Sequence, residues 1–230
     1  MRTILLIASL LVFELTAHTQ TFWSDVPADK VLARGGERRI APQNARVVRL
    51  DVADLERVAR IPMAFVAHTL LDLVGDDTQG RLVERSLPQP FRKDYDAHPD
   101  EGPLSWPRQW SLERWGFLGV QLDTELIAAC AIAFDTPGVD MLDGRDDLAV
   151  LWDIRVAPDR QGTGVGRLLF HAASDWAREH GCRELKVETQ NTNPAACAFY
   201  RAMGCRLRAT HRGVYADHPE EIQLIWNLEL

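Results

Sequence analysis

The pattern of hydrophobic and polar positions in the first half of the chain predicts short elements and one long loop. A short strand is expected at 46–50, followed by a helix over 51–61 that an aspartate caps. A second helix is expected from about Met63 to Val74. The stretch 88–107 is rich in proline and charge, and we expect it to form a long ordered loop.

In the second half, the patterns of strands and helices alternate. From Val165 to Trp176 the apolar residues recur at three and four positions, which is the spacing of one helix face. The nearly continuous apolar run 148–158 is typical of a central strand buried on both faces, and 220–230 alternates like a strand with one wet face. The other expected elements are an antiparallel hairpin over 114–122 and 125–134, a strand at 183–190 and a helix at 193–204.

Length and charge limit the classes of function. With 230 residues, the chain is long enough for one sizeable domain, expected at 46–230 after an extension at 1–45. A formal net charge of -7 argues against nucleic-acid binding and is compatible with a cationic substrate. The four cysteines lack the C-x-x-C pairs of a zinc site, so no metal is expected, and reduced thiols suit a cytoplasmic protein.

The N-terminus leaves an alternative to that location. An apolar run from Ile4 to Phe13 follows Arg2 and resembles a signal peptide, but it is too short to span a membrane. Glu14 ends the run, and no A-x-A cleavage pattern follows. We therefore expect a cytoplasmic protein, with export as the alternative if residues 1–17 act as a leader. If they do not, the apolar run is either a buried N-terminal segment or the result of a mis-assigned start.

A glycine-rich stretch, "RQGTGVGRLLF" from Arg160 to Phe170, directly precedes the helical pattern at Val165. It lacks the lysine of a nucleotide-triphosphate P-loop. It also fails the dinucleotide fingerprint, because counting from Gly162 the third glycine falls one place early, at Gly166. Glycines before a helix can still direct backbone amides and the positive helix end at a diphosphate. Alone, such a turn is a weak signal of a phosphate site.

Two motifs in order carry a family resemblance. Gln161, Gly164 and Gly166 fit [RQ]-x-x-G-x-[GA], and "NTNPAACAFYRAMGC" fits N-x-x-A-x-x-F-Y-x-x-x-G. Together they resemble the GNAT superfamily of acetyl-CoA-dependent N-acetyltransferases. Cys205 stands where a phenylalanine often follows the last glycine of the pattern.

The resemblance implies a fold and a cofactor site. The fold would be α/β (α+β), with a single mixed, mostly antiparallel sheet, a splayed central strand pair and flanking helices. Acetyl-CoA would place its diphosphate on the glycine loop and its pantetheine arm in the opening between the splayed strands. By resemblance, the cofactor-binding residues are Ile154, Arg155, Val156, Gln161, Gly162, Thr163, Gly164, Val165, Gly166, Arg167, Asn193, Ala196 and Phe199.

Acetyl transfer to an amine needs a neutral amine and a proton for the departing thiolate. Tyr200 matches the general acid of the superfamily, although it could instead be a core aromatic. Asp153 is one candidate base, with the alternative that it is a paired carboxylate that locks the strand to Arg155 or His211. Glu188, on the neighbouring strand, is the other candidate. Backbone amides near Ile154 could polarise the thioester carbonyl, while Cys197 is expected to serve in packing.

Residues 84–230 further resemble the streptothricin acetyltransferase branch through "RKDYDAHPD", "VETQNTNPAACAFY" and "EIQLIWNL". This implies a small cationic amine substrate and antibiotic resistance. Two acidic loops, 94–101 and 140–147, could form a mouth for such a cation or could simply be solvated, and tryptophans at 106–115 are expected to anchor the core. Open alternatives are a protein N-terminal or lysine acetyltransferase, and a non-catalytic acetyl-CoA-binding regulatory module. No membrane span is expected, and a homodimer stays open.

Overall fold

The structure is a computed structural model that describes residues 41–76, 80–97 and 100–230. Its contacts divide the chain into two compact units. The glycine-loop unit comprises the described residues up to Phe65, with Lys93–Val187 and Leu228–Leu230. The tyrosine unit comprises Val66–Arg92 and Glu188–Asn227. The expected extension at 1–45 lies almost entirely outside the described residues, as does the apolar run at 4–13.

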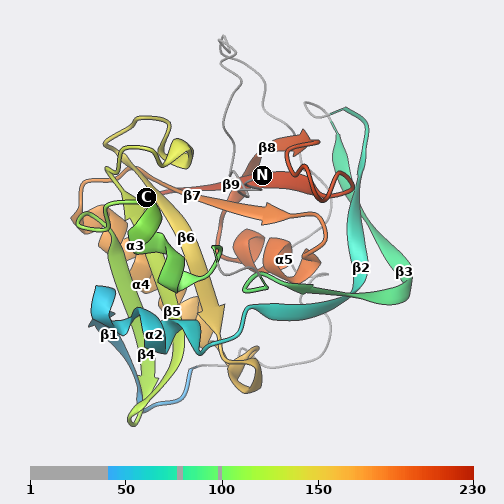
Figure 1. The fold of residues 1–230 in the computed structure, drawn as a ribbon. Helices are drawn as coiled ribbons and strands as arrows, with labels where there is room; N and C mark the ends of the chain where they lie inside the picture. The colour runs from blue at the N-terminus through green and yellow to red at the C-terminus, as the bar shows by residue number, and fades with distance from the viewer. Residues whose placement is uncertain (1–40, 77–79, 98–99) are drawn as a thin grey trace. The chain divides into compact units, whose positions relative to one another are not determined.

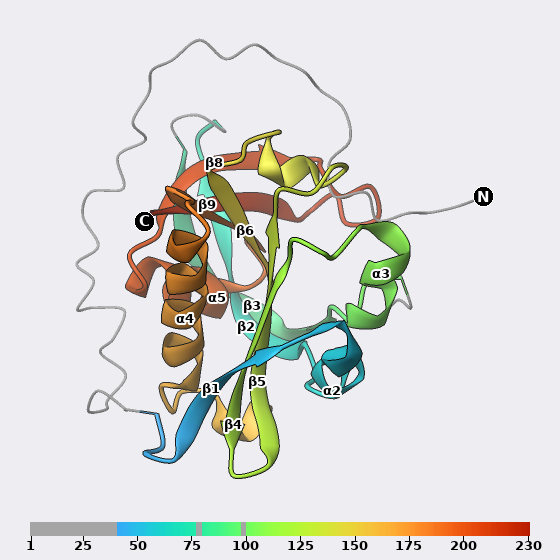
Figure 2. The same cartoon turned by 90° about the vertical axis from the view of Figure 1, so that its left-hand side faces the viewer.

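The glycine-loop unit is built on antiparallel strands. In the order β1, β4, β5, β6, each strand pairs with the next. Helix α4 lies along one side of these strands, and α2 and α3 lie on the other (Figure 2). The bounds are β1 Ala45–Leu50, a 3-10 turn Val52–Asp54, α2 Leu55–Ala59, α3 Trp106–Gln109, β4 Gly116–Leu122, β5 Glu125–Phe134, β6 Leu148–Val156 and α4 Val165–Glu179.

Strand β7, Glu184–Gln190, starts in the glycine-loop unit and continues into the tyrosine unit. It pairs in parallel with β6 over three positions, Leu148–Val150 against Glu184–Lys186, whereas β6 pairs with β5 over the whole span from Ala149 to Val156. The short parallel ladder is what the expected splay of these two strands requires. The large sheet has the order β1-β4-β5-β6-β7-β9-β8, which confirms the predicted mixed, mostly antiparallel α/β fold.

The tyrosine unit contains most of the remaining elements. Strand β9 pairs antiparallel with β8, and β2 pairs with β3 in a separate two-stranded ribbon (Figure 1). The bounds are β2 Ala64–Val74, β3 Arg81–Asp94, α5 Pro194–Ala202, β8 Arg206–Arg212 and β9 Ile222–Glu229. No described helix is both long enough and apolar enough to cross a membrane.

The helix expected from Met63 to Val74 is wrong, because this segment is strand β2. Its apolar residues lie on both faces, so their spacing does not separate a helix from a strand. Distant contacts decide the matter. The backbone N–H and C=O of Leu71 bond the C=O and the side-chain amide of Asn191, both at 3.0 Å, and Arg85 pairs with Asp72 across the ribbon at 2.6 Å.

The loop expected at 88–107 is also largely wrong. Strand β3 continues to Asp94, and Pro103–Ser105 and α3 form helical turns further on. Prolines are tolerated in β3 because a two-stranded ribbon leaves one edge of each strand without a ladder partner. The other expected elements are confirmed within a few residues. They are the strand at 46–50, the capped helical segment that follows it, the β4–β5 hairpin, β6, α4, β7, α5 and β9.

Candidate active site

The glycine loop has the conformation that an anion site at a helix start needs. Gly162 and Gly164 have φ angles of 72° and 90°, a region that residues with a side chain rarely adopt. Gly164 is the N-cap of α4. Within the described chain no side chain caps this end of the helix, and its first turn holds no acidic residue. These features fit a diphosphate, which would be held by backbone amides and favoured by the helix dipole.

The remaining predicted loop residues either hold the turn or line it. The Gln161 amide donates to the Val156 carbonyl at 3.3 Å, and the Thr163 hydroxyl donates to the Arg160 carbonyl at 2.6 Å. Val165 is fully buried and fixes the start of α4 in the core. Gly166 is half-buried, whereas Arg167 is exposed and available to add positive charge.

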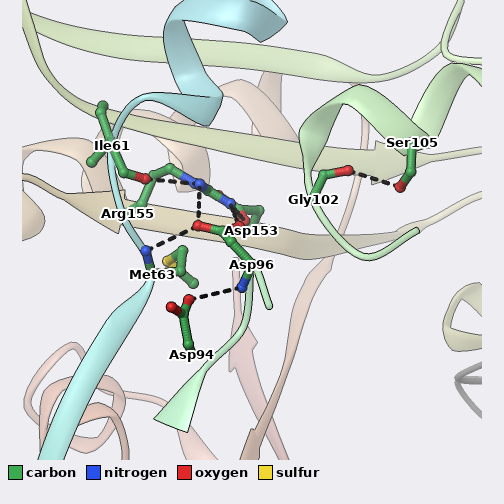
Figure 3. Close-up of polar contacts among 8 residues, drawn as sticks. All are labelled: Ile61, Met63, Asp94, Asp96, Gly102, Ser105, Asp153 and Arg155. Atoms are coloured by element: carbon green, nitrogen blue, oxygen red, sulfur yellow. Dashed lines mark hydrogen bonds and ion pairs between the residues drawn. The ribbon is translucent and has the colours of Figure 1, made fainter. Parts of the chain in front are cut away.

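Strand β6 carries a cation that is almost completely enclosed. Arg155 is 3% exposed, and its guanidinium donates to both carboxylate oxygens of Asp153, at 2.9 and 2.6 Å (Figure 3). It also donates to the Ile61 carbonyl at 2.8 Å and to the two oxygens of Asp96 at 3.3 Å. Burial opposes the charge, but the two carboxylates raise the pKa of Arg155 overall. Arg155 therefore stays positively charged.

Asp96 connects this cation to the chain on either side of the β2–β3 ribbon. Its Oδ2 accepts from the backbone N–H of Met63 at 3.1 Å, and its own N–H donates to Asp94 at 3.1 Å (Figure 3). We call Arg155, Asp153 and Asp96 the Arg155 cluster. It ties the residues just before β2 and just after β3 to strand β6. Asp153 is thus paired with Arg155, as in the alternative to its role as a base.

Several carboxylates of the two acidic loops form ion pairs. Besides Asp96, Asp100 pairs with Arg108 at 3.3 Å, and Asp147 pairs with Arg145 at 2.8 Å. Asp143 pairs with Lys186 at 2.5 Å. Much of the negative charge on these loops is therefore neutralised locally. The tryptophans of this region are anchors as expected, since Trp106 and Trp115 are buried and Trp110 packs edge-on against Trp152 at 4.8 Å between ring centroids.

Helix α5 of the tyrosine unit carries the second motif. Asn193 is the N-cap of the helix, and its Oδ1 accepts from the Ala196 N–H at 3.0 Å. A cofactor contact from Asn193 would therefore use its amide group or its backbone. Tyr200 is 5% exposed and packs against the half-buried Phe199. Burial raises the pKa of Cys197 to about 11, which fits its expected packing role.

Glu188, near the end of β7, accepts hydrogen bonds from Tyr215 and Gln223. The phenol of Tyr215 donates to its Oε1 at 2.6 Å, and the amide of Gln223 donates to its Oε2 at 2.8 Å. The amide of Gln190 donates to the Tyr215 oxygen at 2.9 Å and lies 3.5 Å from Glu188 Oε1. The phenol and the amides thus fix the orientation of the carboxylate.

Sequence reasoning missed three of these contacts. Tyr215 belongs to none of the motifs, and it lies 27 positions from Glu188 along the chain. Gln223 was assigned to the wet face of the last strand, but it is 4% exposed and donates inward. Asp96 was noted only as loop charge.

Comparisons with known proteins agree with this architecture. Residues 82–205 match the profile of the Acetyltransferase (GNAT) family. A streptothricin acetyltransferase of Streptomyces lavendulae is 34% identical over 172 residues, which cover 73% of this chain and 85% of the relative. Streptothricin acetyltransferase A of Bacillus subtilis is 38% identical over 80 residues, 34% of this chain and 46% of the relative.

Among solved structures, a Bacillus anthracis protein in complex with acetyl coenzyme A superposes with a TM-score of 0.61. The similarity covers 81% of this chain and 97% of that protein, at 21% identity. At that identity the likeness concerns the fold alone.

Proposed function

Because the chain belongs to the acetyltransferase (GNAT) family and is an acetyl-CoA-dependent N-acetyltransferase, we propose that it acetylates a primary amine of a small cationic molecule of the streptothricin type. The substrate class is carried by one observation: the similarity to the Streptomyces lavendulae enzyme extends over most of both chains, well beyond the two cofactor motifs. The net charge of -7 suits a cationic substrate.

In the proposed site, different predicted residues contact different parts of acetyl-CoA. The first turn of α4, with Gly162 and Gly164, would hold the diphosphate of acetyl-CoA, and Arg167 would add positive charge. By resemblance to the family, the backbone of Ile154 and Val156 would contact the pantetheine arm, and so would the helix start at Asn193. Acetyl-CoA supplies the acetyl thioester that the amine attacks.

Two side chains move protons. Glu188 accepts one from the substrate ammonium, which makes the amine a nucleophile. As the C–N bond forms and the C–S bond breaks, Tyr200 gives its phenolic proton to the departing sulfur. The second proton lost by nitrogen returns to Tyr200 through solvent, and Glu188 releases its proton to water. An ammonium and a thioester thus give an amide, a thiol and one proton.

Glu188 is the better base of the two candidates. Both oxygens of Asp153 accept from the guanidinium of Arg155, and proton transfer to Asp153 would leave a buried cation short of a partner. Glu188 accepts hydrogen bonds from the uncharged side chains of Tyr215 and Gln223, at 2.6 and 2.8 Å. We therefore assign Asp153 to holding Arg155 and Glu188 to accepting the proton.

Two substitutions test this assignment. Glu188→Gln should lower kcat by roughly 10²–10⁴-fold, the range for loss of a general base. Asp153→Asn should keep the pH profile of kcat/KM of the unchanged enzyme, even if it lowers stability. A reversed pattern, with the pH profile altered only in the Asp153 variant, would exchange the two roles.

The substrate class is tested by thiol release from acetyl-CoA with streptothricin, a polyamine, an aminoglycoside and a basic peptide. Turnover concentrated on streptothricin supports the proposal. Preference for the peptide would favour a protein acetyltransferase. Acetyl-CoA binding by isothermal titration, without turnover on any amine, would favour a regulatory module.

A further inference from the structure

We propose that Tyr215 is a positioning residue of the acetyl transfer, which holds the Glu188 carboxylate in the orientation that receives the substrate proton. The inference rests on the proposed role of Glu188 as base and deepens it. The phenolic oxygen of Tyr215 lies 2.6 Å from Glu188 Oε1, within the range of a strong hydrogen bond to a carboxylate.

The loop between β8 and β9 places this one side chain inside the protein. Over 213–220, Tyr215 is buried while Val214 is half-buried and the other residues are exposed. Gly213 starts the loop with a φ angle of 70°. Two backbone bonds shape the turn: His218 N–H donates to the Tyr215 carbonyl at 3.2 Å, and Glu221 N–H donates to the His218 carbonyl at 2.9 Å. The loop thus turns a single phenol inward.

The phenol is itself fixed in direction. The Gln190 amide donates to its oxygen at 2.9 Å, so the hydroxyl hydrogen is left to point at Glu188. Burial and the Glu188 carboxylate raise the pKa of Tyr215 well above its ordinary value. Tyr215 therefore stays protonated and remains a donor throughout the pH range in which an enzyme works.

A second donor fixes the other oxygen of the carboxylate. Gln223 on β9 donates to Glu188 Oε2 at 2.8 Å, from the strand that follows the Tyr215 loop. With Oε1 held by Tyr215 and Oε2 by Gln223, the carboxylate plane cannot rotate without breaking one of these two hydrogen bonds. A base oriented in this way meets the substrate nitrogen in a defined geometry, and small misplacements of a catalytic group reduce rates strongly.

The test is a double-mutant cycle measured as kcat and KM with streptothricin and acetyl-CoA. Tyr215→Phe should lower kcat about 10–100-fold, the effect of a displaced catalytic group, and should leave KM for acetyl-CoA within a factor of about two. In the Glu188→Gln background, Tyr215→Phe should have no further effect, because its contribution passes through the carboxylate. Gln223→Met should behave in the same way if Tyr215→Phe does not fold.

The matched control is Ser174→Ala, which removes another buried hydroxyl whose bond is to the Phe170 carbonyl at 2.9 Å. It should leave kcat unchanged. Tyr215→Phe and Gln223→Met with full kcat, or with losses that persist additively in the Glu188→Gln background, would overturn the positioning role. Full activity of Glu188→Gln itself would instead overturn the proposed function of Glu188, whatever the Tyr215 variant shows.

Discussion

Substitution of the single residue Arg155 should lower the stability of the protein strongly. It is a nearly enclosed cation with two carboxylate partners, and removing one partner of a buried ion pair leaves an uncompensated charge. Arg155→Met should therefore lower the free energy of unfolding by about 3–5 kcal/mol, measured by urea denaturation. Arg49→Met is the control, because its pair with Glu179 is exposed and should contribute about 1 kcal/mol or less. Equal stability of the two variants would contradict the importance of the Arg155 cluster.

Single residues also differ in how far the sequence predicts their surroundings. A short motif places Tyr200 and Asn193 on one helix, since the residues lie close together in the chain. The environment of Glu188 depends on Tyr215 and Gln223, which come from a loop and a strand much later in the chain. No periodicity links these positions, so neither donor could be predicted. For Asp153, the sequence left two interpretations open, and the short distances to Arg155 favour the structural one.

At the scale of elements, the start of α4 makes a sharp prediction. Gly164→Ala forces a side chain into the left-handed region, which costs about 1 kcal/mol, and disturbs the turn that directs amides toward the diphosphate. KM for acetyl-CoA should rise about tenfold or more, since each 1.4 kcal/mol of lost binding is a factor of ten. Gly181→Ala introduces the same strain just beyond the other end of α4, at a φ angle of 82°. It should lower stability and leave that KM unchanged, and a similar rise in both variants would refute an anion site at the helix start.

The elements that sequence patterns predicted well are those whose partners are close in the chain. The β4–β5 hairpin needs only the turn at Asp123, which adopts a φ angle of 55°. In α4, the apolar residues recur at the regular spacing of one helix face. Strand β2 was misread because apolar residues lie on both of its faces. Its identity depends on bonds such as those between Leu71 and Asn191, which are 120 positions apart. Strand β8, between α5 and the last loop, was not predicted at all.

For the whole molecule, net charge predicts how salt affects the reaction. A chain with a formal charge of -7 should attract a polycationic amine over distances of about 10 Å, and ions screen that attraction. KM for streptothricin should therefore rise severalfold between about 0.01 and 0.3 M salt, while kcat changes little. KM for acetyl-CoA, an anion, should not rise in parallel. An unchanged KM for streptothricin would show that local ion pairs, such as Asp143 with Lys186, have already neutralised the relevant field.

The proposed reaction is an acetyl transfer to a streptothricin amine with Tyr200 as the proton donor. The most direct measurement is the initial rate of thiol release from acetyl-CoA with streptothricin, for the unchanged protein and for Tyr200→Phe. We predict turnover by the unchanged protein and a loss of roughly 10²–10⁴-fold in kcat for the variant, with acetyl-CoA binding retained. Equal rates for the two proteins would contradict the role of Tyr200. Absence of turnover with streptothricin, in a protein that binds acetyl-CoA, would contradict the substrate.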